Sequence, residues 1–190
     1  LLPKVLFMVI LAPVIEEYIF RKQLIDRMHI YGEKLAVITS ALMFGLFHGN
    51  LSQLFYAFAL GLVFGYVYLK TGKLRYSIGL HMLINFIGSV VGPFFLEKLA
   101  VLDTMETMDM AALEPILPWL LGFGAYVLVL IGLAIAGLVL LCINKRRVSF
   151  APAELELPKE SRFRTVYLNV GMILLILGCA ALIISNVIML

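Results

Sequence analysis

The chain has 190 residues, of which 63% are hydrophobic and only 14% are charged. A typical soluble domain is about half apolar and about a quarter charged, and a chain of this length cannot bury so much apolar surface in water. The composition excludes a disordered protein, a disulfide-stapled secreted domain and a soluble nucleic-acid binder, and it indicates an integral membrane protein. The net charge of +3 is too small to indicate a polyanionic partner, so no nucleic acid is expected to bind.

Six apolar segments have lengths suited to crossing a bilayer, where a spanning helix needs about 20 residues. Since every backbone polar group in lipid must be bonded internally, we expect these segments to be helices. The predicted fold is therefore an all-α, polytopic transmembrane helix bundle with about six membrane helices. They cover residues 3–27, 35–49, 51–69, 76–96, 116–143 and 167–190.

Basic and non-basic loops alternate between these segments. Because cytoplasmic loops carry an excess of Lys and Arg, the basic loops after the first, third and fifth segments are assigned to the cytoplasm. The chain then divides into a transmembrane core at 1–96, an acidic extracytoplasmic loop at 97–115 and two further transmembrane helices within 116–190. A basic cytoplasmic linker at 144–165 joins those last two helices.

The first apolar segment contains Glu16, Glu17 and Arg21, and ionisable side chains inside a membrane are costly enough to indicate function. Glu17 and Arg21 are four residues apart on one helix face and are expected to form an ion pair. Glu16 is rotated by about 100° from Glu17 and has no such local partner, which suits a general base. An interfacial anchor at a helix end is the alternative interpretation of this cluster. Pro13 is expected to kink the helix and to free backbone carbonyls nearby.

Phe44 and His48 end the second apolar segment, and His81 and Asn85 lie one helical turn apart in the fourth. The imidazole and carboxamide of the latter pair project to one side of the helix, where they could hold a developing oxyanion. A polar clamp between helices is the alternative for His81 and Asn85, and a packing role is the alternative for His48. Counting about 1.5 Å per residue from the flanking cations, His48 lies deeper than Glu16 or His81. The three meet only if helices tilt or the second helix begins below the headgroups.

Small residues one turn apart predict close contacts between membrane helices. Such pairs occur at Gly45/Gly49, Gly61/Gly65 and Gly88/Gly92. The two cysteines, Cys142 and Cys179, lie in apolar runs without the spacing of metal ligands and are predicted to be packing residues.

Taken in this order, the three polar motifs resemble those of the CAAX prenyl endopeptidases and their bacterial relatives, the CPBP or Abi group. The family pattern is EExxxR, then FxxxH, then HxxxN. The matching residues are Glu16, Glu17, Arg21, Phe44, His48, His81 and Asn85. The resemblance covers residues 10–90. Members of the family carry further helices before the first motif, so we expect the sequence to continue upstream.

The resemblance implies an intramembrane endopeptidase of a bacterial cell membrane, acting on a peptide or membrane-protein substrate, membrane-associated or of prenylated type. It implies that Glu16 and His48 activate water and that His81 and Asn85 hold the oxyanion. Supporting residues would be Glu17, Arg21 and Phe44. No cofactor is favoured; because two histidines and a glutamate are typical zinc ligands, a metalloprotease-like zinc site of Glu16, His48 and His81 is the alternative.

Two other functions are compatible with the same residues. One is a non-proteolytic membrane binding or scaffold protein, such as one for bacteriocin self-immunity, although a scaffold has no need of all four polar groups. The other is an ion or proton carrier that uses Glu16 and His81 as a relay. The third, fifth and sixth segments lack further acidic residues, which disfavours a continuous path for ions.

Overall fold

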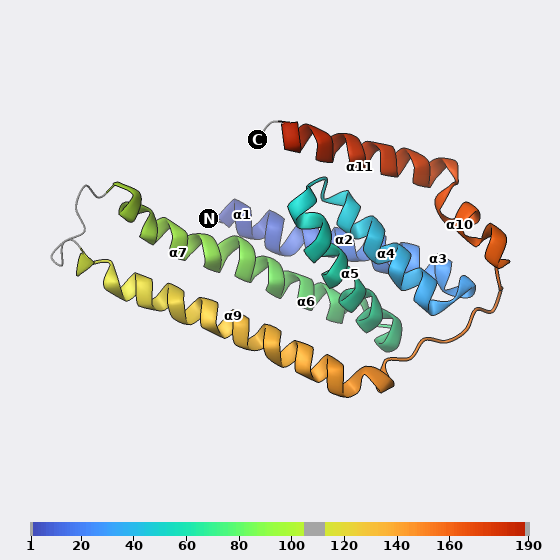
Figure 1. The fold of residues 1–190 in the computed structure, drawn as a ribbon, viewed down its shortest axis with the longest axis horizontal. Helices are drawn as coiled ribbons and strands as arrows, with labels where there is room; N and C mark the ends of the chain where they lie inside the picture. Colours follow the sequence, from blue (N-terminus) through green and yellow to red (C-terminus); the bar gives the residue numbers. More distant parts are fainter. Residues whose placement is uncertain (1, 105–112, 189–190) are drawn as a thin grey trace. The chain divides into compact units, whose positions relative to one another are not determined.

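The structure is a computed structural model that describes residues 2–104 and 113–188 (Figure 1). Regular structure within these ranges is helical throughout, which confirms the all-α prediction. The chain forms two compact units. The motif unit consists of Ile10–Met82 and Phe150–Leu190, and the second unit consists of Leu1–Val9 and Leu83–Ser149. The predicted domains were consecutive stretches of the chain, whereas each compact unit combines two separate stretches.

The helical stretch that carries the first motif changes type several times. Two short α-helices, α1 (Leu2–Lys4) and α2 (Ala12–Glu17), are separated by the π-helix η1 (Val5–Leu11). A second π-helix, η2 (Tyr18–Ile25), leads to α3 (Asp26–Met28) and the 3₁₀-helix η3 (His29–Tyr31). Pro13 lies in the first turn of α2, where its missing N–H ends the π-helical bonding. π-Helical turns inside α-helices are frequent at functional sites.

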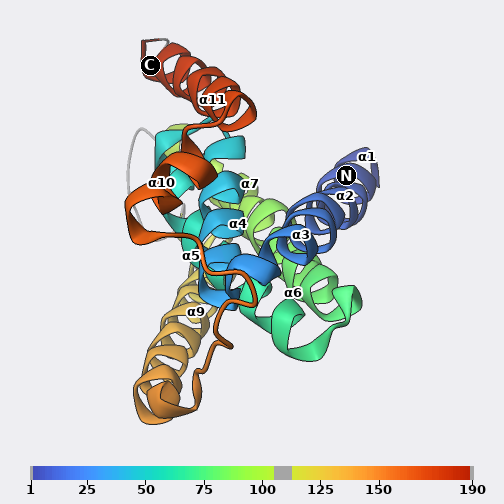
Figure 2. The same cartoon turned by 90° about the vertical axis from the view of Figure 1, so that its right-hand side faces the viewer.

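Helices α4 (Glu33–Phe47) and α5 (Leu51–Thr71) lie side by side in both views (Figures 1 and 2). They approach closely because glycines face the partner helix: a Cβ on Gly61 would stand 2.9 Å from Cα of Ala41. Likewise, a Cβ on Gly45 would stand 2.9 Å from the carbonyl oxygen of Leu54. The predicted helix contacts at these glycines are confirmed.

The other predicted glycine contacts differ from one position to the next. Gly49 and Gly92 also lie against side chains of other helices, as does Gly65. Gly88 is different, because a Cβ there would meet nothing within 4 Å among the described residues, so its predicted contact is wrong. Of the two cysteines, Cys179 is buried and Cys142 is exposed, so the packing role is confirmed for Cys179 alone.

Two clusters of buried apolar side chains connect α4 to its neighbours. One contains Ile25, Ala36, Val37 and Tyr68, and the other contains Phe20, Phe44 and Ala57. Lipid is as apolar as these side chains, so close packing rather than removal from water holds such helices together. This packing fixes the position of α4, which supplies the second motif.

Helix α6 (Leu74–Phe86) continues as the π-helix η4 (Ile87–Val91), α7 (Gly92–Leu99) and the 3₁₀-helix η5 (Ala100–Thr104). Helical structure therefore extends into the segment predicted as an acidic loop, whose residues 105–112 lie outside the described ranges. In the second unit α7 packs on α9 (Leu117–Asn144), where Phe95 stacks on Tyr126 with ring centroids 5.6 Å apart.

The 3₁₀-helix η6 (Lys145–Arg147) follows α9, and the predicted linker leads to α10 (Lys159–Tyr167) and α11 (Val170–Ile188). The predicted linker is hydrogen-bonded to residues at and just before the beginning of α4. The N–H of Ala151 donates to Oε2 of Glu33 at 2.7 Å, and the N–H of Leu155 donates to the carbonyl of Ile30 at 2.9 Å. The beginning of α4 is thus in contact with the segment after residue 149.

Four helices within the described ranges are long and apolar enough to cross a membrane: Leu51–Thr71, Leu74–Asp103, Leu117–Arg147 and Val170–Ile188. They agree with four of the six predicted spans. Helix α4 has 15 residues, which is short for a span of about 20. The count of six stays a prediction.

Candidate active site

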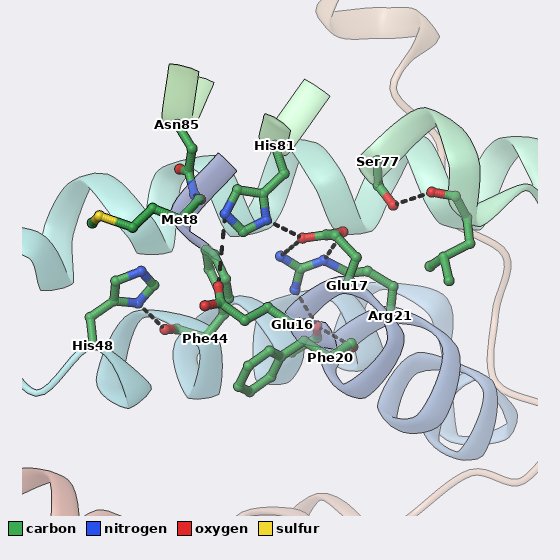
Figure 3. A network of polar contacts seen from close by, with 12 residues as sticks. Met8, Glu16, Glu17, Phe20, Arg21, Phe44, His48, Ser77, His81 and Asn85 are labelled. Carbon is green, nitrogen blue, oxygen red and sulfur yellow. Dashed lines mark hydrogen bonds and ion pairs between the residues drawn. The ribbon is translucent and has the colours of Figure 1, made fainter. Parts of the chain in front are cut away.

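Glu17 and Arg21 form a fully buried ion pair (Figure 3). Nε of Arg21 donates to Oε2 of Glu17 at 3.0 Å, and Nη2 donates to Oε1 at 3.3 Å. Both side chains are 0% exposed. The predicted pairing at a spacing of four residues is therefore confirmed. Because desolvation of two buried charges is costly, such a pair needs further polar partners.

Ser40 on α4 is one of those partners. Its hydroxyl accepts a hydrogen bond from Nη1 of Arg21 at 2.8 Å and donates to the carbonyl oxygen of Phe20 at 2.7 Å. Ser40 is completely buried. The hydroxyl thus ties the guanidinium to the backbone of the first helical stretch.

Aromatic rings surround the guanidinium on its remaining sides. Cζ of Arg21 lies 4.7 Å from the ring centroid of Phe44 and 5.9 Å from that of Phe64. Cations over aromatic faces are attracted by the ring quadrupole. The family-motif residue Phe44 therefore has a defined place, beneath the arginine of the first motif.

His81 on α6 completes this buried group. Its Nδ1 lies 3.1 Å from Oε1 of Glu17, and its ring stacks on Phe64 with centroids 5.3 Å apart. The ring of Phe44 is nearly perpendicular to the same imidazole, with ring centroids 5.4 Å apart. Since an ionised carboxylate can only accept, the hydrogen bond requires the proton on Nδ1. Nε2 is thereby left for other chemistry.

Glu16 lies on the side of His81 that Glu17 does not occupy. Its Oε2 is buried, has no hydrogen-bond partner among the described residues and stands 3.8 Å from Nε2 of His81. This distance is too long for a direct hydrogen bond, and polar groups so spaced are commonly bridged by water. The side chain is 18% exposed, so it is not sealed off like Glu17.

His48 caps the C-terminal end of α4. Its Nδ1 donates to the carbonyl oxygen of Phe44 at 2.8 Å, because a carbonyl can only accept. Its imidazole also meets the Phe44 ring edge-on, with centroids 4.9 Å apart. Phe44 therefore contacts both histidines, and the structure brings Glu16, His48 and His81 into one unit despite the differing depths expected from the sequence.

Asn85 lies in the second unit, where its Nδ2 donates to the carbonyl oxygen of Met8 at 2.8 Å (Figure 3). In a π-helix the N–H of residue i+5 bonds to carbonyl i, and the residue five after Met8 is Pro13, which has no N–H. The predicted freeing of a carbonyl near Pro13 is confirmed by this bond. One N–H of Asn85 thus acts as the polar clamp of the alternative interpretation, and its oxyanion role stays a prediction.

The zinc alternative requires a group of ligand side chains close enough to share one ion. The part of the chain that the structure describes contains no group of three or more His, Cys, Asp or Glu side chains placed to hold a metal ion. A catalytic zinc site needs about three protein ligands, and the zinc alternative of Glu16, His48 and His81 stays a prediction.

Sequence reasoning missed two residues of the buried group, Ser40 and Phe64. A serine in an apolar helix is a weak signal on its own, because membrane helices use small polar residues in many contacts. Phe64 is one of 13 phenylalanines, and its spacing does not distinguish it from the others. Only the packing of α5 against α4 and α6 identifies it.

Comparison with known families agrees with the order of the motifs. Residues 1–87 match the model of the family described as Rce1-like, type II CAAX prenyl endopeptidase. The resemblance inferred from the three motifs is therefore confirmed for the segment that contains them.

One curated relative is the membrane-embedded CAAX protease MroQ of Staphylococcus aureus (strain USA300), which is 32% identical over 88 residues. The alignment covers 43% of this chain and only 36% of the relative's length. No solved structure is significantly similar to the chain. Together with the four apolar helices, the family match identifies a multi-pass membrane protein. Residues 88–190, which include α7, α9, α10 and α11, lie outside the family match.

Proposed function

We propose that the chain is an intramembrane endopeptidase in which Glu16 activates the attacking water. The observation that carries the proposal is the buried, unpartnered Oε2 of Glu16, 3.8 Å from Nε2 of His81 within the described residues. A carboxylate so placed can accept a proton from a water molecule lying between it and the imidazole. The match of residues 1–87 to the model of a peptidase family supports this reading.

Glu17 and Arg21 orient the His81 imidazole for its proposed role. Glu17 accepts from Nδ1, which fixes the orientation and the tautomer of the ring. A proton on Nε2 then faces Glu16, where it can be donated to the oxygen of a tetrahedral intermediate. Arg21 keeps Glu17 ionised and in place through two hydrogen bonds.

His48 has the geometry of a proton carrier. Its Nδ1 is occupied by the carbonyl of Phe44, so its Nε2 is the nitrogen that can exchange a proton. We assign His48 to the water-activating pair with Glu16. In the reaction the water oxygen bonds to the peptide carbon and a water proton passes to Glu16. The C–N bond then breaks as Glu16 returns that proton to the leaving amine.

The proposed substrate is a peptide bond of a membrane-associated or prenylated-type substrate. Two facts support it: the site lies on helices packed in an apolar bundle, and the relative from Staphylococcus aureus is described as a CAAX protease. The binding or immunity role is the weaker candidate, because binding alone has no use for an unpartnered buried carboxylate.

The test is peptide cleavage by the purified protein in nanodiscs, with prenylated CAAX-type peptides and a broad peptide library as substrates. Glu16→Gln should lower kcat by about 10²–10⁴-fold, the usual contribution of a general base. Glu154→Gln, at an exposed position in the linker, is the matched control and should leave cleavage unchanged.

Each assay is repeated with and without a chelator. Activity that survives the chelator and disappears in Glu16→Gln supports the proposal. Loss in the chelator with recovery in zinc contradicts the metal-free assignment. Absence of cleavage of every peptide by the folded wild-type protein contradicts the peptidase function and favours the binding role.

A further inference from the structure

The turn that follows His48 is held by a helix from the other end of the chain. The carbonyl oxygen of Gly49 accepts a hydrogen bond from Nδ2 of Asn186 on α11 at 2.7 Å. A Cβ on Gly49 would stand 3.1 Å from Cβ of Leu182, which shows how closely α11 approaches. Leu182 and Asn186 are four residues apart and so share one face of α11. That face packs on the residue next to His48.

The direction of the His48 side chain depends on this turn. The backbone N–H of His48 bonds to the carbonyl of Gly45, and the N–H of Gly49 bonds to that of Leu46 at 3.0 Å. Gly49 has φ = +61°, the left-handed conformation that ends helices and that glycine adopts without strain. A shift of Gly49 therefore moves the last turn of α4, which carries His48.

The same C-terminal segment also contacts α4 nearer its beginning. Oγ1 of Thr39 and the hydroxyl of Tyr167 are hydrogen-bonded at 2.9 Å, and Thr39 precedes the buried Ser40. The N–H of Ala151 bonds to Glu33 in the first turn of α4. Helix α4 is thus held at its start, its middle and its end by residues outside the family match of 1–87.

We propose that Asn186 is a positioning residue that fixes His48 through the Gly49 turn. The inference rests on the proposed function, in which His48 exchanges a proton. Without the carboxamide, the Gly49 carbonyl loses its hydrogen bond from the helix that packs on it. Because unsatisfied backbone groups are unfavourable in apolar surroundings, the turn then rearranges and His48 leaves its position.

The first experiment measures kcat and KM for wild type, Asn186→Leu, Asn186→Asp and Asn186→Gln in nanodiscs. Leucine matches the size of asparagine without hydrogen bonding, aspartate replaces the donor by an acceptor, and glutamine retains an N–H donor. We expect kcat to fall by about ten- to a hundredfold in the first two variants, with KM nearly unchanged and partial recovery in Asn186→Gln. Ser185→Ala, at the exposed neighbouring position, is the control and should match wild type.

The second experiment does not depend on peptidase activity. The chain has three histidines, so imidazole ¹⁵N spectra contain few signals, which His→Gln variants assign. We expect Nδ1 of His48 to be protonated in wild type, since it donates to Phe44. In Asn186→Leu the His48 signals should shift, while those of the exposed His29 should not.

Unchanged His48 signals in Asn186→Leu overturn the inference, even if kcat falls. An unchanged kcat beside an active wild type also overturns it. If the wild type cleaves nothing, the proposed function fails, and the His48 spectra alone then decide whether Asn186 positions this residue.

Discussion

Phe64 lies against the imidazole of His81, with ring centroids 5.3 Å apart and an interplanar angle of 26°. The same ring is 2% exposed, and Cζ of Arg21 lies 5.9 Å from its centroid. Stacking fixes the plane of the imidazole, so that Nδ1 meets Glu17 while Nε2 faces Glu16. A residue without any polar atom in its side chain thereby orients the polar site.

Replacement of this ring should slow the proposed reaction. Phe64→Leu keeps an apolar side chain but removes the stacked pair, which is worth about 0.5–1.5 kcal/mol beyond burial. If that energy is lost from the transition state, kcat falls by up to about tenfold. The measurement is steady-state cleavage beside Phe55→Leu, an exposed position on the same helix. Equal kcat in the two variants would contradict the orienting role.

The same substitution should affect stability very differently at the two adjacent glutamates. Glu17→Gln removes the charge opposite a fully buried Arg21 and should lower the free energy of unfolding by about 3–5 kcal/mol. Glu16→Gln disturbs no ion pair with Arg21 and should leave stability nearly unchanged. Reversible unfolding in mixed detergent micelles measures both. Equal destabilisation by the two variants would show that the carboxylates share one structural role.

The pairing of Glu17 with Arg21 was predictable because it is local: a spacing of four residues on a helix determines it. The gathering of Glu16, His48 and His81 was inferred from the combination of polar residues on three apolar helices and from the family resemblance. Their depths along straight helices argued against it, and the tertiary packing of α4 against the first helical stretch resolves the difference. Ser40 and Phe64 had no comparable local signal.

The tertiary contacts of the rear half of the chain were likewise not predictable from its sequence. Its helices carry no motif, and the sequence indicates only that they are apolar. The contact of Asn186 with Gly49 joins residues far apart in the chain, and no helical period encodes such a pairing. The π-helical segments η1 and η2 were equally hidden, because no sequence pattern distinguishes them from α-helix.

The contact between α4 and α5 should be sensitive to a single methyl group. Gly61→Ala places a Cβ 2.9 Å from Cα of Ala41, so the helices must separate, at a cost of about 1–3 kcal/mol for overpacking. Gly79→Ala is the matched control, since a Cβ there meets nothing within 4 Å among the described residues. Unfolding of both variants in detergent checks the difference, and equal stability would refute the close approach.

Glu33 should make stability depend on pH. Partial burial opposes its ionisation, but hydrogen bonds from Lys70 and the Ala151 N–H outweigh this and lower its pKa below the ordinary 4.5. A lowered pKa stabilises the fold above the ordinary value, and this contribution is lost as the pH falls through the folded-state pKa. At pH 7, Glu33→Gln should cost about 0.2–1 kcal/mol, as for other solvent-accessible ion pairs.

The difference between wild type and Glu33→Gln should shrink as the pH falls below 4.5. Unfolding curves over a range of pH measure it. Glu154→Gln, at an exposed position in the linker that contains Ala151, should follow wild type at every pH. A difference that grows on acidification has the wrong sign for this hydrogen-bonded carboxylate.

The close approach of Gly49 to Leu182 also sets an evolutionary constraint. A side chain at position 49 must tolerate a left-handed backbone, which after glycine favours asparagine, and it needs space that Leu182 now fills. In full-length homologues the two positions should therefore covary, with asparagine at 49 accompanied by alanine or glycine at 182. Selection on the turn beside His48 would then be visible as covariation at position 182 of α11, a helix that carries no catalytic motif.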